Sequence, residues 1–160
     1  MSQSHIDLLS RYFGAFQRRD GNAMASCYHV KATFNDPAFS LERAEIGAMW
    51  RMLCSRSTDL RVEFSDLRAD AMNGSADWQA WYTFSSTRRA VHNVVQSNFR
   101  FADGLIIEQV DTFDFWRWSR QALGPVGVVL GWSTPLRNKV RKTARKSLDR
   151  FIASECDGAG

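Results

Sequence analysis

Apolar side chains recur at helical spacing in two stretches before the middle of the chain. In residues 4–19 they fall three or four positions apart, and Ser4 is placed to cap the first turn. Asp20 is a good cap for a short second helix. Helical spacing returns over residues 41–55, with Ser40 before it as a cap. The pattern therefore predicts three helices in this part of the chain.

From residue 60 onwards, apolar and polar side chains alternate, as is typical of strands. The predicted strands begin near Leu60 and Ala76 and then cover residues 91–101 and 105–116. Short turns are expected between them, at Asn73-Gly74, at residues 86–89 and at residues 102–104. Four consecutive strands with such short connections form an antiparallel meander.

These elements predict an α+β fold, in which the helices pack on one face of a strongly curved antiparallel sheet. Such a sheet and its helices form a cone with a pocket at the open end. A further short strand, residues 30–35, is expected after the second helix, because Asp36-Pro37 ends it. A chain of 160 residues is usually organised as one domain.

The basic residues are concentrated near the C-terminus. The net charge is +4, but residues 1–116 carry 12 Lys and Arg against 14 Asp and Glu, whereas residues 117–150 carry 9 against 1. The body of the protein therefore gives no reason to expect nucleic acid as a partner. Ser133 or Thr134, followed by Pro135, predicts the start of a C-terminal helix.

This C-terminal helix combines an apolar stripe with basic side chains on its other faces. It is expected to pack on the acidic body of the domain, to lie on an anionic membrane surface or nucleic acid, or to form a contact between two copies. The predicted organisation is a cone domain of residues 1–118, a basic helical extension of residues 119–152 packed on or beside it, and a flexible tail of residues 153–160.

Aromatic residues are unusually frequent, with 6 Trp, 3 Tyr and 11 Phe. Most fall on the predicted meander, where they are expected to form the core and to line the pocket. They occupy both alternating faces of residues 113–118. This indicates that the second face of the sheet is covered too, by a dimer partner or by the C-terminal segment.

The remaining composition favours a soluble, cytoplasmic protein. Hydrophobic residues make up 44% and charged residues 24%, which is ordinary for a globular chain. Three cysteines without paired spacing argue against a disulfide framework. The N-terminus lacks a secretory pattern, and the longest apolar run, residues 122–132, is too short to span a bilayer. No set of His, Cys, Asp or Glu has the spacing of a metal site, so no metal is expected.

Two segments resemble a known superfamily. Residues 12–37, YFGAFQRRDGNAMASCYHVKATFNDP, resemble the opening of the ketosteroid isomerases and of the nuclear transport factor 2-like superfamily, which includes the SnoaL-type polyketide cyclases. The later run NFRFADGLIIEQVDTFDFW resembles the last hairpin of the same superfamily. The resemblance covers roughly residues 4–118 and implies the same cone fold.

The resemblance also implies roles for three residues. Asp36 falls where ketosteroid isomerases keep their general base, and Tyr12 where they keep an oxyanion-hole tyrosine. Asp111 falls on the strand that carries a catalytic Asp in limonene epoxide hydrolases. Ser97 stands where the isomerases have a second oxyanion donor, a protonated Asp.

Each candidate also has a simpler interpretation. Asp36 can be a turn residue that accepts hydrogen bonds from nearby backbone N–H groups. Asp111 can point outward and pair with Arg100, or inward, where it needs a partner or a proton. His92 can be structural or exposed, since strand parity places it opposite Ser97. The expected pocket lining is Trp50, Met49, Phe84, Ser97, Phe99, Phe113, Trp116 and His92.

The resulting functional hypothesis is a cone-pocket protein that binds a small hydrophobic or cyclic ligand. As an isomerase or cyclase without a cofactor, it would move a proton through Asp36, with or without Asp111, next to a carbonyl polarised by Tyr12. An epoxide hydrolase is the next enzymatic alternative. A ligand-binding module without catalysis, or a dimeric interaction module, is the alternative outside catalysis. A homodimer is expected in each case.

Overall fold

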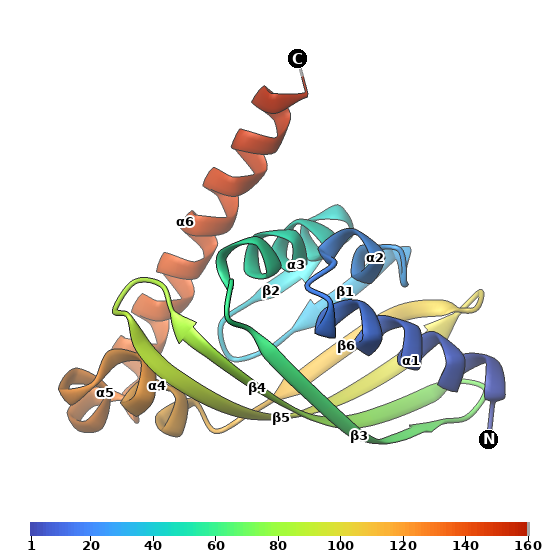
Figure 1. The fold of residues 1–160 in the computed structure, drawn as a ribbon, viewed down its shortest axis with the longest axis horizontal. Helices are drawn as coiled ribbons and strands as arrows, with labels where there is room; N and C mark the ends of the chain where they lie inside the picture. Colours follow the sequence, from blue (N-terminus) through green and yellow to red (C-terminus); the bar gives the residue numbers. More distant parts are fainter. Residues whose placement is uncertain (160) are drawn as a thin grey trace.

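A computed structural model of the chain describes residues 1–159 (Figure 1). The helices are α1 (Gln3–Gln17), α2 (Gly21–Ala25), α3 (Ala44–Arg56), α4 (Phe115–Leu123), α5 (Pro125–Leu130) and α6 (Thr134–Gly158). The strands are β1 (Tyr28–Asn35), β2 (Ser40–Glu42), β3 (Arg61–Ala69), β4 (Asn73–Phe84), β5 (Arg89–Ala102) and β6 (Leu105–Thr112).

One curved sheet contains all the strands, in the order β2-β1-β6-β5-β4-β3 (Figure 1). The predicted meander is confirmed, because β3 to β6 pair antiparallel with their neighbours in the chain. The predicted α+β cone is confirmed as well. The sequence pattern does not predict two further pairings: β1 joins the meander parallel to β6, and β1 forms a hairpin with β2.

The alternation of side chains on β5 separates an inner face from an outer one. Val95, Ser97 and Phe99 are buried, whereas Gln96 and Asn98 between them are exposed. The inner face meets α1 and α3 in a core rich in aromatic rings that pack edge to face, as such rings prefer. The strand period thus decides which polar side chains enter the cone.

Two predicted boundaries were wrong. The strand predicted over residues 105–116 ends at Thr112, because the Asp114 carboxylate accepts a hydrogen bond from the Arg117 N–H and caps α4. The helix predicted over residues 41–55 begins only at Ala44, since Ser40 and its neighbours pair with β1 instead. Aromatic residues on both faces of residues 113–118 therefore reflect a helix, not a strand with two covered faces.

Helix α4 closes the end of the sheet at which β4 meets β5. The Trp118 Nε1–H donates to the Tyr82 hydroxyl at 2.9 Å, and the Arg117 guanidinium lies 3.3 Å from His92 Nδ1. Trp118 also contacts the ring of Phe84 edge on. Helix α4, which contains residues 115–118, therefore covers Tyr82 and Phe84 at this end of the sheet. The domain boundary expected after Trp118 falls inside this helix.

The C-terminal helix begins as the sequence predicts and ends later. The Ser133 hydroxyl accepts from the Leu136 N–H, and proline occupies the first turn. The helix runs to Gly158, so it includes most of the stretch predicted as a flexible tail, of which Gly160 lies outside the described residues. Among the described residues, no helix is long and apolar enough to cross a membrane.

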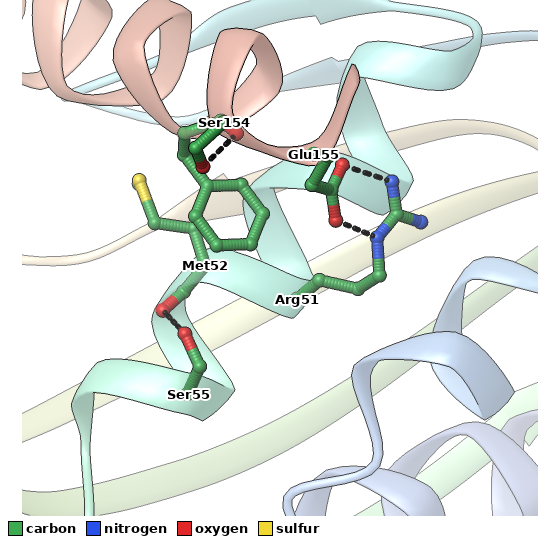
Figure 2. Close-up of polar contacts among 6 residues, drawn as sticks. Arg51, Met52, Ser55, Ser154 and Glu155 are labelled. Carbon is green, nitrogen blue, oxygen red and sulfur yellow. Dashed lines mark hydrogen bonds and ion pairs between the residues drawn. The ribbon is translucent and has the colours of Figure 1, made fainter. Parts of the chain in front are cut away.

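The second half of α6 is anchored on α3. Leu148 is fully buried in the main core. Figure 2 shows Arg51 of α3 and Glu155 of α6 joined by two hydrogen bonds, at 2.7 and 2.9 Å. Arg145 pairs with Glu45 in the same way, one α6 side chain to one α3 side chain. This half of α6 therefore contacts both the core and α3.

Replacing Leu148 with alanine tests this anchoring. The substitution leaves a cavity between α6 and the core, so the free energy of unfolding should fall by about 2–5 kcal/mol in urea titrations. Leu130→Ala is the control, because Leu130 is exposed and its truncation should change stability by about 0.5 kcal/mol or less. Equal effects of the two substitutions would contradict the anchored position of α6.

Candidate functional site

Asp111 lies at the centre of a buried polar network inside the cone. It sits on β6 opposite Ser97 of β5, and both side chains belong to the inner face. The Ser97 hydroxyl donates to Asp111 Oδ1 at 2.5 Å, and the Gln109 amide donates to the same oxygen at 2.9 Å. Asp111 therefore points inward, which is one of the two orientations expected, and its partners are two neutral donors.

Gln109 links Asp111 to a pair of tyrosines. Its amide nitrogen also donates to the Tyr12 hydroxyl at 3.3 Å, and its carbonyl oxygen accepts from the Tyr28 hydroxyl. The two tyrosine oxygens lie 3.1 Å apart. Since Tyr28 has one proton and gives it to Gln109, Tyr12 is the donor between the two tyrosines. Tyr12 and Asp111, predicted as catalytic residues, are therefore joined through one amide.

Two tryptophans complete the network. Trp50 of α3 donates from its indole N–H to the Tyr28 hydroxyl at 2.9 Å, and Trp78 of β4 donates to the Ser97 hydroxyl at 2.8 Å. Every buried donor of the cluster therefore has an acceptor. The exception among the acceptors is Asp111 Oδ2, to which no described residue donates a hydrogen bond. This oxygen is the one site in the network that is left for a proton or a ligand.

Burial controls the protonation of this network. It raises the pKa of Asp111 to about 7, although the hydrogen bonds from Ser97 and Gln109 lower that pKa and the charge of Asp36 raises it further. Burial likewise raises the pKa of both tyrosine hydroxyls well above the usual range, so both stay neutral. Asp111 is thus the group of the network that changes charge near neutral pH.

Asp36 occupies the turn between β1 and β2 and is half-buried. Its Oδ1 accepts from the N–H groups of Ala38 and Phe39 at 2.7 and 2.6 Å, as a turn residue would. Its Oδ2 has no donor among the described residues. Burial raises the pKa of Asp36 to about 6, against the lowering effect of these two bonds and of the charge of Arg141. The site therefore contains two carboxyl groups with raised pKa values, and the charge of Asp36 contributes to the raised pKa of Asp111.

The predicted lining residues separate into three groups. Met49, Trp50, Ser97 and Phe99 are buried in the core, around or beside the network. Phe84 and Phe113 are half-buried. The last two, Trp116 and His92, lie away from Asp111. Trp116 is 43% exposed and donates a hydrogen bond to the Val128 carbonyl of α5. His92 stacks on Trp81 of the outer face.

The interior of the cone is filled by its own rings. Trp50 contacts Tyr12, Phe16 and Phe34 at ring-centroid distances of 6.1, 5.0 and 5.7 Å. Two surface hollows lie elsewhere. One, of about 700 Å³, lies beside α4 and is lined by four arginines, and the other, of about 600 Å³, lies at the turn between β3 and β4. Within residues 1–159, no three His, Cys, Asp or Glu side chains gather as a metal site requires.

Sequence reasoning missed three members of the network. Gln109 had a usable signal, because it lies two residues before Asp111 and must share its face. Trp78 had a similar signal, because the alternation of β4 places its side chain on the buried face. Tyr28 had none, since its place beside Gln109 depends on the parallel pairing of β1 with β6.

Solved structures of the same architecture come from several bacteria. A protein with a ketosteroid isomerase-like fold from Catenulispora acidiphila, in complex with trimethylamine, has a TM-score of 0.64 and 12% identity, covering 74% of this chain and 93% of that chain. A proposed polyketide cyclase from Silicibacter sp. TM1040 has a TM-score of 0.63 and 20% identity, covering 74% and 95%. An LEH-like epoxide hydrolase from M. tuberculosis has a TM-score of 0.65 and 17% identity, covering 81% and 97%.

At these identities the likeness shows the fold alone. No curated protein matches the chain. The family is shown by the sequence itself, since the model of the SnoaL-like domain matches residues 9–109, which is more than half of the chain. This range includes Tyr12, Asp36 and the strands of the meander as far as Gln109. The chain therefore belongs to the SnoaL-like family.

Proposed function

We propose that this protein is an acid–base enzyme without a cofactor, which transfers a proton on a small hydrophobic carbonyl compound. Asp111 is the proton-transferring residue. One observation carries the proposal: a buried carboxyl group with a pKa of about 7 has one oxygen held by Ser97 and Gln109 and the other free of protein donors. A general base works best when its pKa lies near the working pH.

The proposed step moves one proton and breaks no heavy-atom bond. Asp111 Oδ2 takes a proton from the carbon next to the substrate carbonyl, and the electron pair of that C–H bond forms the enolate. The bonds from Ser97 and Gln109 keep the carboxyl group in place during the transfer. For a β,γ-unsaturated ketone this enolate is a conjugated dienolate, so return of the proton from Asp111 to its γ carbon gives the conjugated isomer and restores the carboxylate.

Tyr12 is the proposed donor to the enolate oxygen. In the structure its proton goes to Tyr28, so polarising a carbonyl requires its hydroxyl to turn from Tyr28 to the substrate. Tyr28 keeps Trp50 as a donor after this change. A neutral donor in a site without water stabilises developing negative charge strongly.

The substrate is proposed to enter from the side of Asp36. The charge of Asp36 raises the pKa of both Asp111 and Tyr82, so the turn after β1 is close enough to interact with both side chains. Aromatic rings occupy this space, so binding requires side chains such as Trp118 to move. An apolar ligand suits such a lining. The complex of the Catenulispora acidiphila protein with trimethylamine supports a small ligand for this fold.

A ligand-binding module without catalysis is the second candidate. The observation that favours it is the filled interior, where Trp50 contacts Tyr12, Phe16 and Phe34. Asp36, whose Oδ1 accepts from two backbone N–H groups, then has the role of a turn residue. In this case the network of Asp111 specifies the packing of the core.

The pH dependence of stability tests whether Asp111 titrates as proposed. Its folded-state pKa of about 7 lies above the ordinary 3.8, so the folded chain binds the proton more tightly than the unfolded chain. The free energy of unfolding should therefore fall as pH rises from about 4 to 7, by at most about 4 kcal/mol from this group.

Asp111→Asn removes this titration. Its stability relative to the wild type should rise with pH and be greatest at pH 8, in urea titrations at pH 4, 6 and 8. Asp77→Asn, on the exposed face of β4, is the matched control and should follow the wild type. Parallel curves for Asp111→Asn and the wild type would show that Asp111 does not titrate in this range.

Catalysis is tested by a turnover screen with cyclic enones, polyketide-like ketones and epoxides. For any substrate that is converted, Asp111→Asn should lower kcat by about 10²–10⁴-fold, because the general base is lost. Asp77→Asn should leave kcat unchanged. Full activity of Asp111→Asn would refute its role, and binding without turnover by the wild type would favour the second candidate.

A further inference from the structure

The corner formed by α4, α5 and the start of α6 exposes a large apolar surface. We call it the apolar corner, and its members are Trp116, Val126, Val128, Val129, Leu130 and Trp132, each 43–72% exposed. Most exposed apolar side chains of a soluble protein are scattered singly. Six of them on one short stretch indicate a surface that is used for contact.

The backbone holds the apolar corner in a fixed position. Gly127 lies so close to α4 that a Cβ atom there would come within 1.8 Å of the Ser119 carbonyl oxygen. A second glycine, Gly124, has a φ of +64° and turns the chain between the two helices. Helix α5 therefore packs on α4 through the face that contains Gly127. Its valines lie on the other faces and are exposed.

The arginine hollow adjoins the apolar corner. It is lined by Arg88, Arg89, Arg117 and Arg120. In the part of the chain that the structure describes, none of the four forms an ion pair with a carboxylate. The Nε atom of Arg120 is buried without any hydrogen-bond partner there. Unpaired guanidinium groups around a hollow fit an anion with several oxygens, such as a phosphate.

Direct contacts connect the two features. The Arg120 guanidinium lies 4.2 Å from the centroid of the Trp116 ring, and the Trp116 indole donates to the Val128 carbonyl. Arg89 lies against Gly124, where α5 begins. The first half of α6, with exposed Arg137, Lys139, Arg141 and Lys142, continues the positive charge beyond Trp132. A ligand on the apolar corner therefore meets a positively charged border.

We propose that the apolar corner and the arginine hollow together dock the protein on an anionic phospholipid surface. Valine and tryptophan side chains enter the boundary between headgroups and acyl chains, and the arginines bind lipid phosphates. Apolar side chains bordered by Arg and Lys are the pattern of proteins that lie in this boundary. Tryptophan also prefers this depth of the bilayer.

Charge argues against a second copy of the chain as the occupant. In a symmetric dimer the same surface faces itself, so four unpaired arginines on each copy would approach four identical ones. Like charges brought together in this way oppose association. A membrane with anionic lipids offers negative charge to the arginine hollow and an apolar layer to the apolar corner. It is therefore complementary to both.

The test uses the full chain in flotation with two kinds of vesicle, one of phosphatidylcholine and one of phosphatidylcholine with phosphatidylglycerol at about 3:1. Binding is expected only to the second kind, and added salt should weaken it. Val129→Glu, at a position 64% exposed, should weaken it about tenfold or more. Val30→Glu, at a position 78% exposed on β1, is the matched control and should bind as the wild type does.

A second pair of variants tests the arginine hollow. The double substitution Arg88→Gln and Arg89→Gln should weaken binding to the negative vesicles and reduce its salt dependence. Arg18→Gln with Arg56→Gln removes the same charge from exposed positions elsewhere and should have little effect. Circular dichroism and thermal unfolding establish that each variant is folded.

Three results would overturn the proposal. The first is no binding to negative vesicles at low ionic strength. The second is equal loss of binding in Val129→Glu and Val30→Glu. The third is a dimer in sedimentation velocity that Val129→Glu dissociates, because this would assign the apolar corner to a second copy.

Discussion

The fold depends on how one carboxyl group is accommodated in an aromatic core. An isolated carboxylate in such surroundings is costly, and Asp111 avoids most of this cost through two neutral donors and a pKa near neutrality. The donors come from neighbouring positions of β5 and β6, and they are held in turn by groups on α1, α3, β1 and β4. The register of the sheet and the placement of the helices must therefore be correct together before Asp111 can be buried.

The same network explains why the proposed chemistry and the stability of the fold are linked. A carboxyl group with a raised pKa is a better base near neutral pH, and it is also a group whose ionisation destabilises the folded chain. Asp36 contributes to both effects, since its charge raises the pKa of Asp111. The C-terminal helix balances part of this charge through Arg141, which lowers the pKa of Asp36.

The sequence pattern predicts the meander, the N-terminal helices and the start of α6, because each is determined by local period and capping. It fails where distant pairing decides the structure. The sequence predicts that Ser40 caps a helix, but Ser40 pairs with Asn35 in a hairpin. The parallel pairing of β1 with β6 has no signal in the local sequence. Among the candidate residues, Asp111 and Tyr12 meet through Gln109, whereas His92 and Trp116 face other surroundings. Strand parity alone places His92 correctly on the outer face, while Trp116 was assigned to a strand that is a helix.

The most direct test of this account is the ionisation of Asp111 itself. The carboxyl carbons of ¹³C-labelled aspartate can be followed by NMR as a function of pH, with Asp111→Asn to assign the signal. The account predicts that this signal titrates with a pKa of about 7, well above that of an exposed aspartate. A pKa near 4 would show that the carboxylate is ionised in the core throughout the neutral range and would contradict its role as the general base.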